Sequence, residues 1–169
     1  MEDKLQQEVL DTIDYIKNVH QTNNGDPMEV FRNGNCGNIY TFLSKEFPEK
    51  AIPCGIYRFR ELLHIITKIE DKYYDISGEV TLEKYIKYLL ETNEAYSSNP
   101  SHYVIEEISI EKVESLSNNY KAITGMRNSD KKTARKIIPS PEDGNMVKIQ
   151  EALDLRRKNR TRENNEKCR

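Results

Sequence analysis

Three residues of this 169-residue chain have side chains that could together carry out nucleophilic chemistry: Cys36, His64 and Asp75. A cysteine attacks as its thiolate, whereas a free thiol with a pKa near ~8.5 is mostly protonated at neutral pH. A neighbouring imidazole takes up the proton and stabilises the anion, and a carboxylate fixes the orientation and tautomer of that imidazole. The three residue types therefore predict a nucleophile, a base and an orienting acid.

The segment around Cys36 is expected to place the thiol at the start of a helix. Apolar and aromatic side chains recur at helical spacing from Cys36 to Phe47, a proline ends the run, and Asn35 suits the N-cap position. The unpaired N–H groups of a helix N-terminus stabilise a thiolate. The backbone N–H of Cys36, together with the side-chain amide of Asn33, Asn35 or Asn38, is the candidate oxyanion hole, and the sequence does not choose among the three asparagines.

His64 and Asp75 fall on two strands that the sequence predicts as a β-hairpin, joined by a polar turn at residues 70–72. A two-residue turn makes Asp75 the diagonal neighbour of His64, and a turn one residue earlier places them directly opposite. Both registers put them on one face, because side chains alternate along a strand. The other face is predicted to be the buried one, with Leu63, Ile65, Ile69, Tyr74 and Ile76. His64 and Asp75 are therefore not expected to serve as core residues.

The rest of the chain supplies the elements that position this hairpin. Further helices are predicted at residues 3–20, 81–92, 111–123 and 142–160, and further strands at 52–59 and 103–110. The basic run 156–162 has no apolar stripe and is expected to fray. The expected fold class is α+β: a Cys-bearing helix on an antiparallel sheet of three to five strands, with an N-terminal helix and a basic, partly helical C-terminal extension.

Charge divides the chain into two regions. Residues 1–125 hold 13 Lys and Arg against 21 Asp and Glu, a formal charge of −8, whereas residues 126–169 hold 13 against 7, a charge of +6. We therefore expect a folded domain at 1–123 and a basic extension at 124–169. Such an extension suits an acidic partner or nucleic acid, although it lacks the interleaved aromatic residues that stack on bases.

Several classes of protein are not expected from the sequence. No apolar stretch is long enough for a transmembrane helix, and the acidic start lacks the apolar core of a signal peptide, so a cytoplasmic protein without a membrane partner is expected. The three cysteines are scattered, which argues against a disulfide framework; Cys54 is expected to be structural and Cys168 inert. No zinc motif or Gly-rich phosphate loop occurs, so neither a metal nor a cofactor is expected.

Three segments resemble the papain-like cysteine hydrolase superfamily, in particular its small bacterial and phage forms and transglutaminase-like proteins. They are Asn33-Gly34-Asn35-Cys36, Leu62-Leu63-His64-Ile65-Ile66 and Tyr73-Tyr74-Asp75-Ile76-Ser77-Gly78. The resemblance implies a papain-like core in which Cys36 is the nucleophile, His64 the base and Asp75 the residue that orients it. It covers roughly residues 33–78, under a third of the chain. Many cell-wall peptidases of this fold carry a histidine at the third position, and transglutaminases space the histidine and acid more widely, so the substrate class stays open.

The sequence thus favours a cysteine-dependent hydrolase or acyl-transferase that acts on an amide or isopeptide bond of a peptide or protein, in the manner of a thiol protease. Two alternatives remain. The first is a non-enzymatic, papain-like binding or inhibitory module of phage or mobile-element origin. The second is a nucleic-acid-binding protein that uses the basic C-terminal extension.

Overall fold

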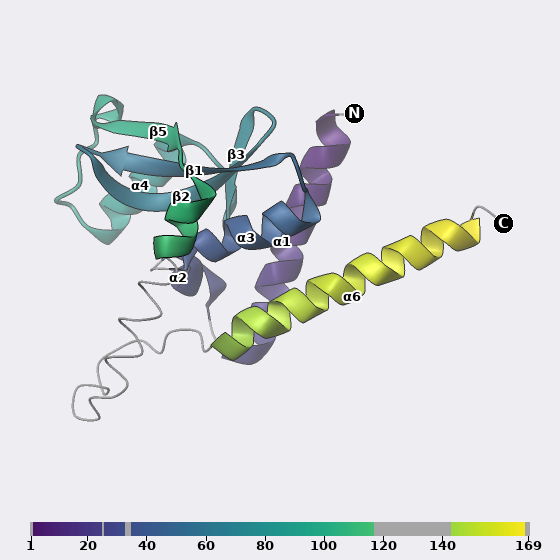
Figure 1. Cartoon of the computed structure of the whole chain (residues 1–169). Coiled ribbons are helices and arrows are strands. Elements are labelled where there is room, and N and C mark those ends of the chain that lie inside the picture. Colours follow the sequence, from purple (N-terminus) through teal and green to yellow (C-terminus); the bar gives the residue numbers. More distant parts are fainter. Residues whose placement is uncertain (1, 25, 33–34, 117–142, 168–169) are drawn as a thin grey trace, which may run out of the picture.

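The computed structural model describes residues 2–24, 26–32, 35–116 and 143–167. These residues form an α+β fold in which helices cover both faces of a five-stranded antiparallel sheet (Figure 1). The predicted fold class is confirmed at this level. Among the described residues, no helix combines the length and the apolar character needed to cross a membrane.

The elements follow one another in an order close to the predicted one. The helices are α1 (Glu2–Asn24), α2 (Pro27–Arg32), α3 (Cys36–Glu46), α4 (Leu82–Thr92) and α6 (Asp143–Lys167), with a 3-10 turn η1 (Pro100–His102). The strands are β1 (Ala51–Arg58), β2 (Glu61–Ile69), β3 (Lys72–Asp75), β4 (Gly78–Val80) and β5 (Tyr103–Glu107). Their order across the sheet is β4-β3-β2-β1-β5. Residues 110–116 are also helical, up to the edge of the described segment.

The β2–β3 hairpin has the first of the two predicted registers. Ile69 pairs with Lys72, so the turn between them has two residues, and Glu70 in that turn has a φ of 55°. A second hairpin, which the sequence analysis missed, follows at once: β3 ends at Asp75 and β4 begins at Gly78. Gly78 has a φ of 104°, a conformation that only glycine adopts without strain.

Both faces of the sheet are buried. Of the predicted core residues, Ile65, Ile69, Tyr74 and Ile76 are buried, and α1 and α3 cover most of them. Leu63 was predicted on the same face, which was wrong: it is partly buried and packs with the cluster on the other face. That face was not expected to bury His64 and Asp75. The amphipathic helix α4 packs its apolar side on that face, and His64 and Asp75 are each only 2% exposed.

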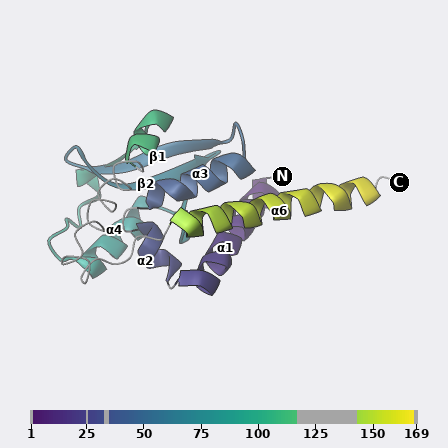
Figure 2. The ribbon, with the colours of Figure 1, turned by 60° about the horizontal axis from the view of Figure 1, so that its bottom comes forward.

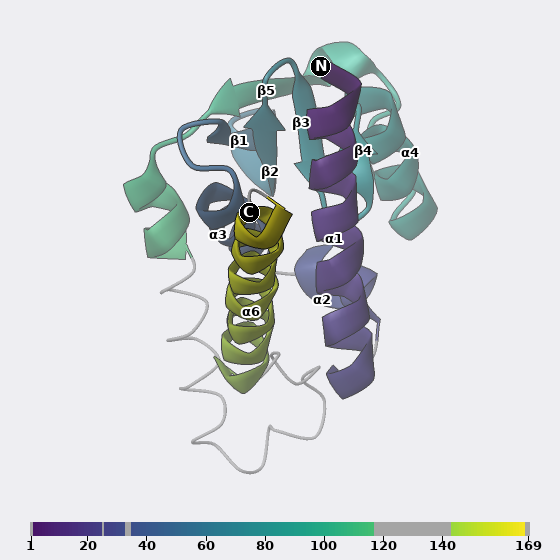
Figure 3. The ribbon, with the colours of Figure 1, turned by 90° about the vertical axis from the view of Figure 1, so that its right-hand side faces the viewer.

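Helix α6 packs beside α1, as all three ribbon views indicate (Figures 1, 2 and 3). Ile149 and Leu153 of α6 are fully buried, in the same core cluster as Val9 of α1 and Leu43 of α3. The second half of α6 projects beyond the sheet (Figures 1 and 2). The domain boundary expected near residue 123 lies outside the described residues.

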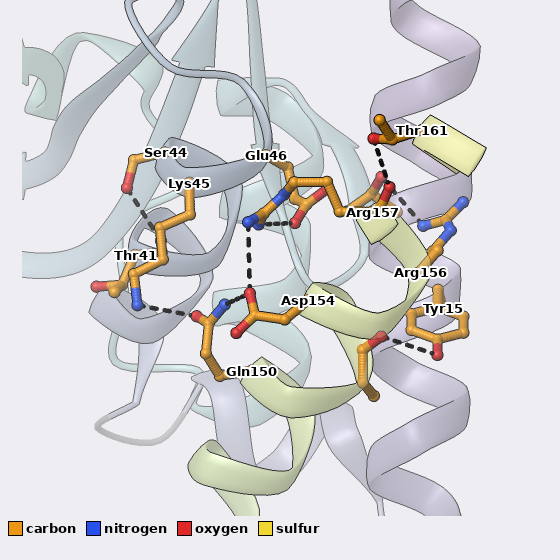
Figure 4. Close-up of polar contacts among 12 residues, drawn as sticks. Tyr15, Thr41, Ser44, Lys45, Glu46, Gln150, Asp154, Arg156, Arg157 and Thr161 are labelled. Carbon is orange, nitrogen blue, oxygen red and sulfur yellow. Dashed lines mark hydrogen bonds and ion pairs between the residues drawn. The ribbon is translucent and has the colours of Figure 1, made fainter. Parts of the chain in front are cut away.

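The basic run 156–162 is helical, so the expected fraying there was wrong. Contacts of its first two residues help to hold the helix on the body (Figure 4). The guanidinium of Arg156 lies 4.9 Å from the centre of the Tyr15 ring, and Arg157 forms an ion pair with Glu46 at the end of α3. These are tertiary contacts, which the periodicity of a single segment does not reveal.

Candidate active site

Cys36 is the first residue of α3, as predicted, and its side chain is partly exposed. Asn35 occupies the N-cap position, but its side chain makes no capping hydrogen bond. The N–H groups of the first turn of α3 therefore remain close to the sulfur without a side-chain cap. The backbone of Gly37 hydrogen-bonds to the Cys36 thiol, which uses one of these groups.

The Cys36 thiol lies beside β2 at a point where β2 has lost its pairing with β3. β3 pairs with β2 only from Ile69 back to Thr67 and then turns away into β4. The preceding part of β2 therefore has no neighbouring strand on that side among the described residues. The backbone of Ile65 hydrogen-bonds there to the Cys36 thiol. The departure of β3 thus lets a helix on one face of the sheet reach a histidine on the other.

His64 and Asp75 are in direct contact, as the hairpin phase predicted. Nε2 of His64 lies 3.0 Å from Oδ2 of Asp75, and both side chains are buried. The ring of His64 also lies close enough to the Cys36 thiol for each group to shift the pKa of the other. Because Nε2 faces the carboxylate, Nδ1 is the ring nitrogen available to the sulfur. The structure therefore brings the three predicted residues together in one row.

The charges of this row support an ionised thiol. Burial of Cys36 opposes ionisation and is the largest single influence on its pKa. The hydrogen bond to His64, the charge of its imidazolium and the backbone hydrogen bonds from Ile65 and Gly37 outweigh burial, so the pKa of Cys36 lies below its ordinary value. A larger share of the thiol is therefore anionic at neutral pH.

His64 is held in its charged form. Burial, the largest single influence, lowers its pKa, but the hydrogen bonds to Asp75 and Cys36 and their negative charges raise the pKa to about 9. The carboxylate of Asp75 is ionised in turn: burial acts to raise its pKa, yet His64, Ser77 and Arg32 together lower it. The shifts of all three pKa values thus favour the charged form of each group.

Both carboxylate oxygens of Asp75 have polar partners. Oδ1 accepts hydrogen bonds from the backbone N–H of Ser77, at 2.6 Å, and from the Ser77 hydroxyl. Oδ2 contacts His64 and lies 3.4 Å from Nε of Arg32, which comes from the end of α2. The carboxylate therefore has little freedom to rotate, which fixes the imidazole that it orients.

Tyr85 of α4 holds the other side of the imidazole. Its ring stacks on that of His64, with centres 5.1 Å apart and planes only 6° from parallel. Tyr85 lies in the helix predicted at residues 81–92, but this contact was not expected from the sequence. Nor were the contacts of Arg32 and Ser77 expected, because none of the three belongs to a pattern of chemistry-bearing residues with its own spacing.

The three candidate oxyanion-hole asparagines differ in their contacts. Asn33 lies outside the described residues. Asn38 donates from Nδ2 to Oδ1 of Asn35 at 3.1 Å, so its amide holds its neighbour in place. Asn35 is buried, and its own Nδ2 makes no hydrogen bond to the described part of the chain. Asn35, next to Cys36, therefore has a side-chain donor that is unpaired and buried in the described part of the chain.

The remaining residues singled out from the sequence either pack elsewhere or lie outside the described residues. Cys54 is buried among apolar residues that pack between the sheet and α4, and burial raises its pKa. Cys168 is outside the described residues, as are the basic residues between 127 and 136. Across the described ranges, no cluster of three or more His, Cys, Asp or Glu side chains could hold a metal ion.

Comparison with known proteins gave one family. The model of a family described as phage YunG-like protein matches residues 12–118, which is more than half of the chain. The chain belongs to the phage YunG-like family. The matched region includes Cys36, His64 and Asp75 but ends before α6. Neither the search of curated proteins nor the search of solved structures gave a match.

Proposed function

We propose that this phage YunG-like protein is a cysteine-dependent hydrolase or acyl-transferase with a papain-like mechanism. Its substrate would be an amide or isopeptide bond of a peptide or protein. The proposal rests on one observation above all: partly exposed Cys36, at the N-terminus of a helix, lies in one row with the buried, hydrogen-bonded pair of His64 and Asp75.

The first step is attack of the Cys36 thiolate on the substrate carbonyl carbon. A C–S bond forms, and the carbonyl oxygen becomes an oxyanion that the backbone N–H of Cys36 and the free Nδ2 of Asn35 stabilise. His64 then gives its proton to the leaving nitrogen, the C–N bond breaks and an amine leaves. The product is a thioester on Cys36, with His64 neutral.

The second step releases the acyl group. Neutral His64 takes a proton from water or from an incoming amine, which attacks the thioester carbon. The C–S bond breaks, and the cycle returns to the thiolate and imidazolium. Water gives hydrolysis and an amine gives acyl transfer, so the two outcomes share every residue of the site.

Site-specific labelling with iodoacetamide, read by mass spectrometry, tests the central pair. Cys36 should be alkylated at pH 7, whereas Cys54, buried and with a raised pKa, serves as an internal control and should stay unlabelled. His64→Ala should lower the alkylation rate of Cys36 by about 10-fold or more, because the thiolate loses its counter-charge. Equal rates in both proteins, or labelling of Cys54 in preference to Cys36, would contradict the proposal and favour a binding or inhibitory module.

The role of Asn35 has its own test, because alkylation forms no oxyanion whereas acylation does. Asn35→Ala should slow acylation of Cys36 by p-nitrophenyl acetate by about 10²-fold and leave alkylation by iodoacetamide nearly unchanged. Asn38→Ala is the matched control, which removes the amide that holds Asn35 but not its donor, and should have a smaller effect. A parallel loss of both reactions in Asn35→Ala would assign Asn35 a structural role instead.

A further inference from the structure

Arg32 is a cation that the proposed mechanism does not use, yet it contacts the site. Its Nε lies 3.4 Å from Oδ2 of Asp75, the same oxygen that contacts His64, and its side chain is 11% exposed. Nε is buried and makes no hydrogen bond to the described residues, so the contact is an ion pair only. On the opposite side the guanidinium lies 4.0 Å from the centre of the Tyr88 ring.

The charges of the site change during the proposed reaction, and Arg32 matters most in the middle of it. In the resting site the Cys36 thiolate and Asp75 are two anions, and His64 and Arg32 are two cations. Once the acyl–sulfur bond has formed and His64 has given its proton to the leaving amine, Cys36 and His64 are both neutral. Asp75 would then be a buried, unpaired anion if no other cation were present, which is a costly state.

We propose that Arg32 is a positioning residue that keeps Asp75 paired throughout the reaction and limits how tightly the carboxylate holds the proton of His64. Oδ2 divides its interaction between the imidazolium and the guanidinium, so each is held less strongly than it would be alone. Without Arg32 the whole charge of Asp75 would act on His64, and the imidazolium would become a poorer proton donor. This inference rests on the proposed function for its purpose, but its physical content concerns His64 and Asp75 alone.

The groups that face the pair of His64 and Asp75 come from three helices and from the turn after β3. Asp75 is faced by His64 from β2, by Arg32 from α2 and by Ser77, which follows β3. His64 is faced by the Cys36 thiol from α3, by Asp75 and by the ring of Tyr85 from α4. Among these contacts, Arg32 supplies a positive charge that does not change with pH over the range in which His64 titrates.

The test is a histidine NMR titration of the full chain, which has only three histidines. Arg32→Met, which keeps an apolar chain for Tyr88 to cover, should raise the titration midpoint of His64 by about one pH unit above the wild-type value. In the Asp75→Asn background the same substitution should move the midpoint far less, because the charge then has no carboxylate to act through. An unmoved midpoint, or an equal shift in both backgrounds, overturns the proposal.

A second variant keeps the test decisive if the neutral one does not fold. Arg32→Lys retains the charge without the planar guanidinium, and its midpoint should remain close to that of the wild type. A midpoint that rises by about one pH unit in Arg32→Lys overturns the proposal, because the charge alone would then not be sufficient. Iodoacetamide labelling of His64→Ala reports separately on the proposed function, so failure of one is distinguishable from failure of the other.

Discussion

Two buried histidines of this protein have opposite electrostatic environments. His64 and His20 are 2% and 1% exposed. His64 lies between a thiol and a carboxylate, and its pKa is raised to about 9. His20, on α1, packs the edge of its ring against Phe31 at 5.3 Å, and neither ring nitrogen has a hydrogen-bond partner among the described residues. Burial, only partly offset by the charge of Asp26, lowers the pKa of His20.

The difference shows that burial alone does not decide the charge of a histidine. Burial acts to lower the pKa of both rings, and it is the largest single influence on each. The neighbours reverse the outcome in His64, because two anions and two hydrogen bonds favour the imidazolium. At neutral pH the surroundings of His64 therefore favour the protonated ring, whereas those of His20 favour the neutral ring.

The largest effect is expected from Asp75→Asn, which removes the anion that distinguishes the surroundings of His64 from those of His20. Its pKa should fall, and the rate of acylation of Cys36 by p-nitrophenyl acetate at pH 7 should drop by about 10²- to 10⁴-fold. Asp71→Asn, in the exposed turn of the same hairpin, is the matched control and should react like the wild type. A wild-type rate in Asp75→Asn would show that acylation of Cys36 does not depend on the Asp75 carboxylate.

A titration of the three histidine ring signals measures the pKa difference between His64 and His20 directly. The signal of His64 should titrate near pH 9, and that of His20 should titrate below the ordinary value of 6.5. His64→Gln and His20→Gln assign the two signals by their disappearance. The comparison fails if His64 and His20 titrate together near their ordinary value.

The next expected effect is on stability in acid. His20 has a lowered pKa in the folded state, so its contribution to stability is complete above the unfolded pKa of about 6.5 and is lost as the pH falls below it. His20→Leu keeps an apolar side chain against Phe31 and removes this loss. Between pH 7 and pH 5, urea unfolding should show a smaller decrease in the free energy of unfolding for His20→Leu, by about 1.4 kcal/mol per unit of the original shift. An identical decrease in both proteins would show that folding does not shift the pKa of His20.

The smallest effect is expected from the projecting half of α6, which contacts neither histidine. Lys158, Arg160 and Arg162 are exposed there. Replacing all three with glutamine should change the free energy of unfolding by less than about 0.5 kcal/mol per residue and leave both histidine midpoints in place. A shift of the His64 midpoint in this variant would mean that distant charge, rather than direct neighbours, sets its pKa.

The sequence predicted the central row because local rules position its members. A cysteine after an asparagine at a helix start, and a hairpin whose phase puts His64 and Asp75 on one face, need no knowledge of the tertiary structure. The same rules predicted a helix at residues 81–92, and the hydroxyl of Thr81 caps it by accepting a hydrogen bond from the backbone N–H of Lys84 at 3.2 Å. Those rules do not identify the orienting contacts of Arg32 and Tyr85, which come from helices elsewhere in the chain.

Two further features were beyond the reach of sequence patterns. The sheet face of His64 carries apolar side chains as well as polar ones, and only the packing of α4 decides that it is buried. Residues 156–162 are helical without an apolar stripe, and their first two residues contact other helices, as in the ion pair of Arg157 with Glu46 of α3. In both cases a distant element determines the state of a locally ambiguous segment.

The contacts of α6 bear on any truncation of the protein to the region that the family model matches. The matched region, residues 12–118, contains Cys36, His64 and Asp75 but omits Val9, Ile149 and Leu153, each at most 1% exposed in the intact chain. A fragment with these ends would present to water the apolar surface that the three side chains now cover. The region of sequence similarity is thus smaller than the unit that buries its own apolar core.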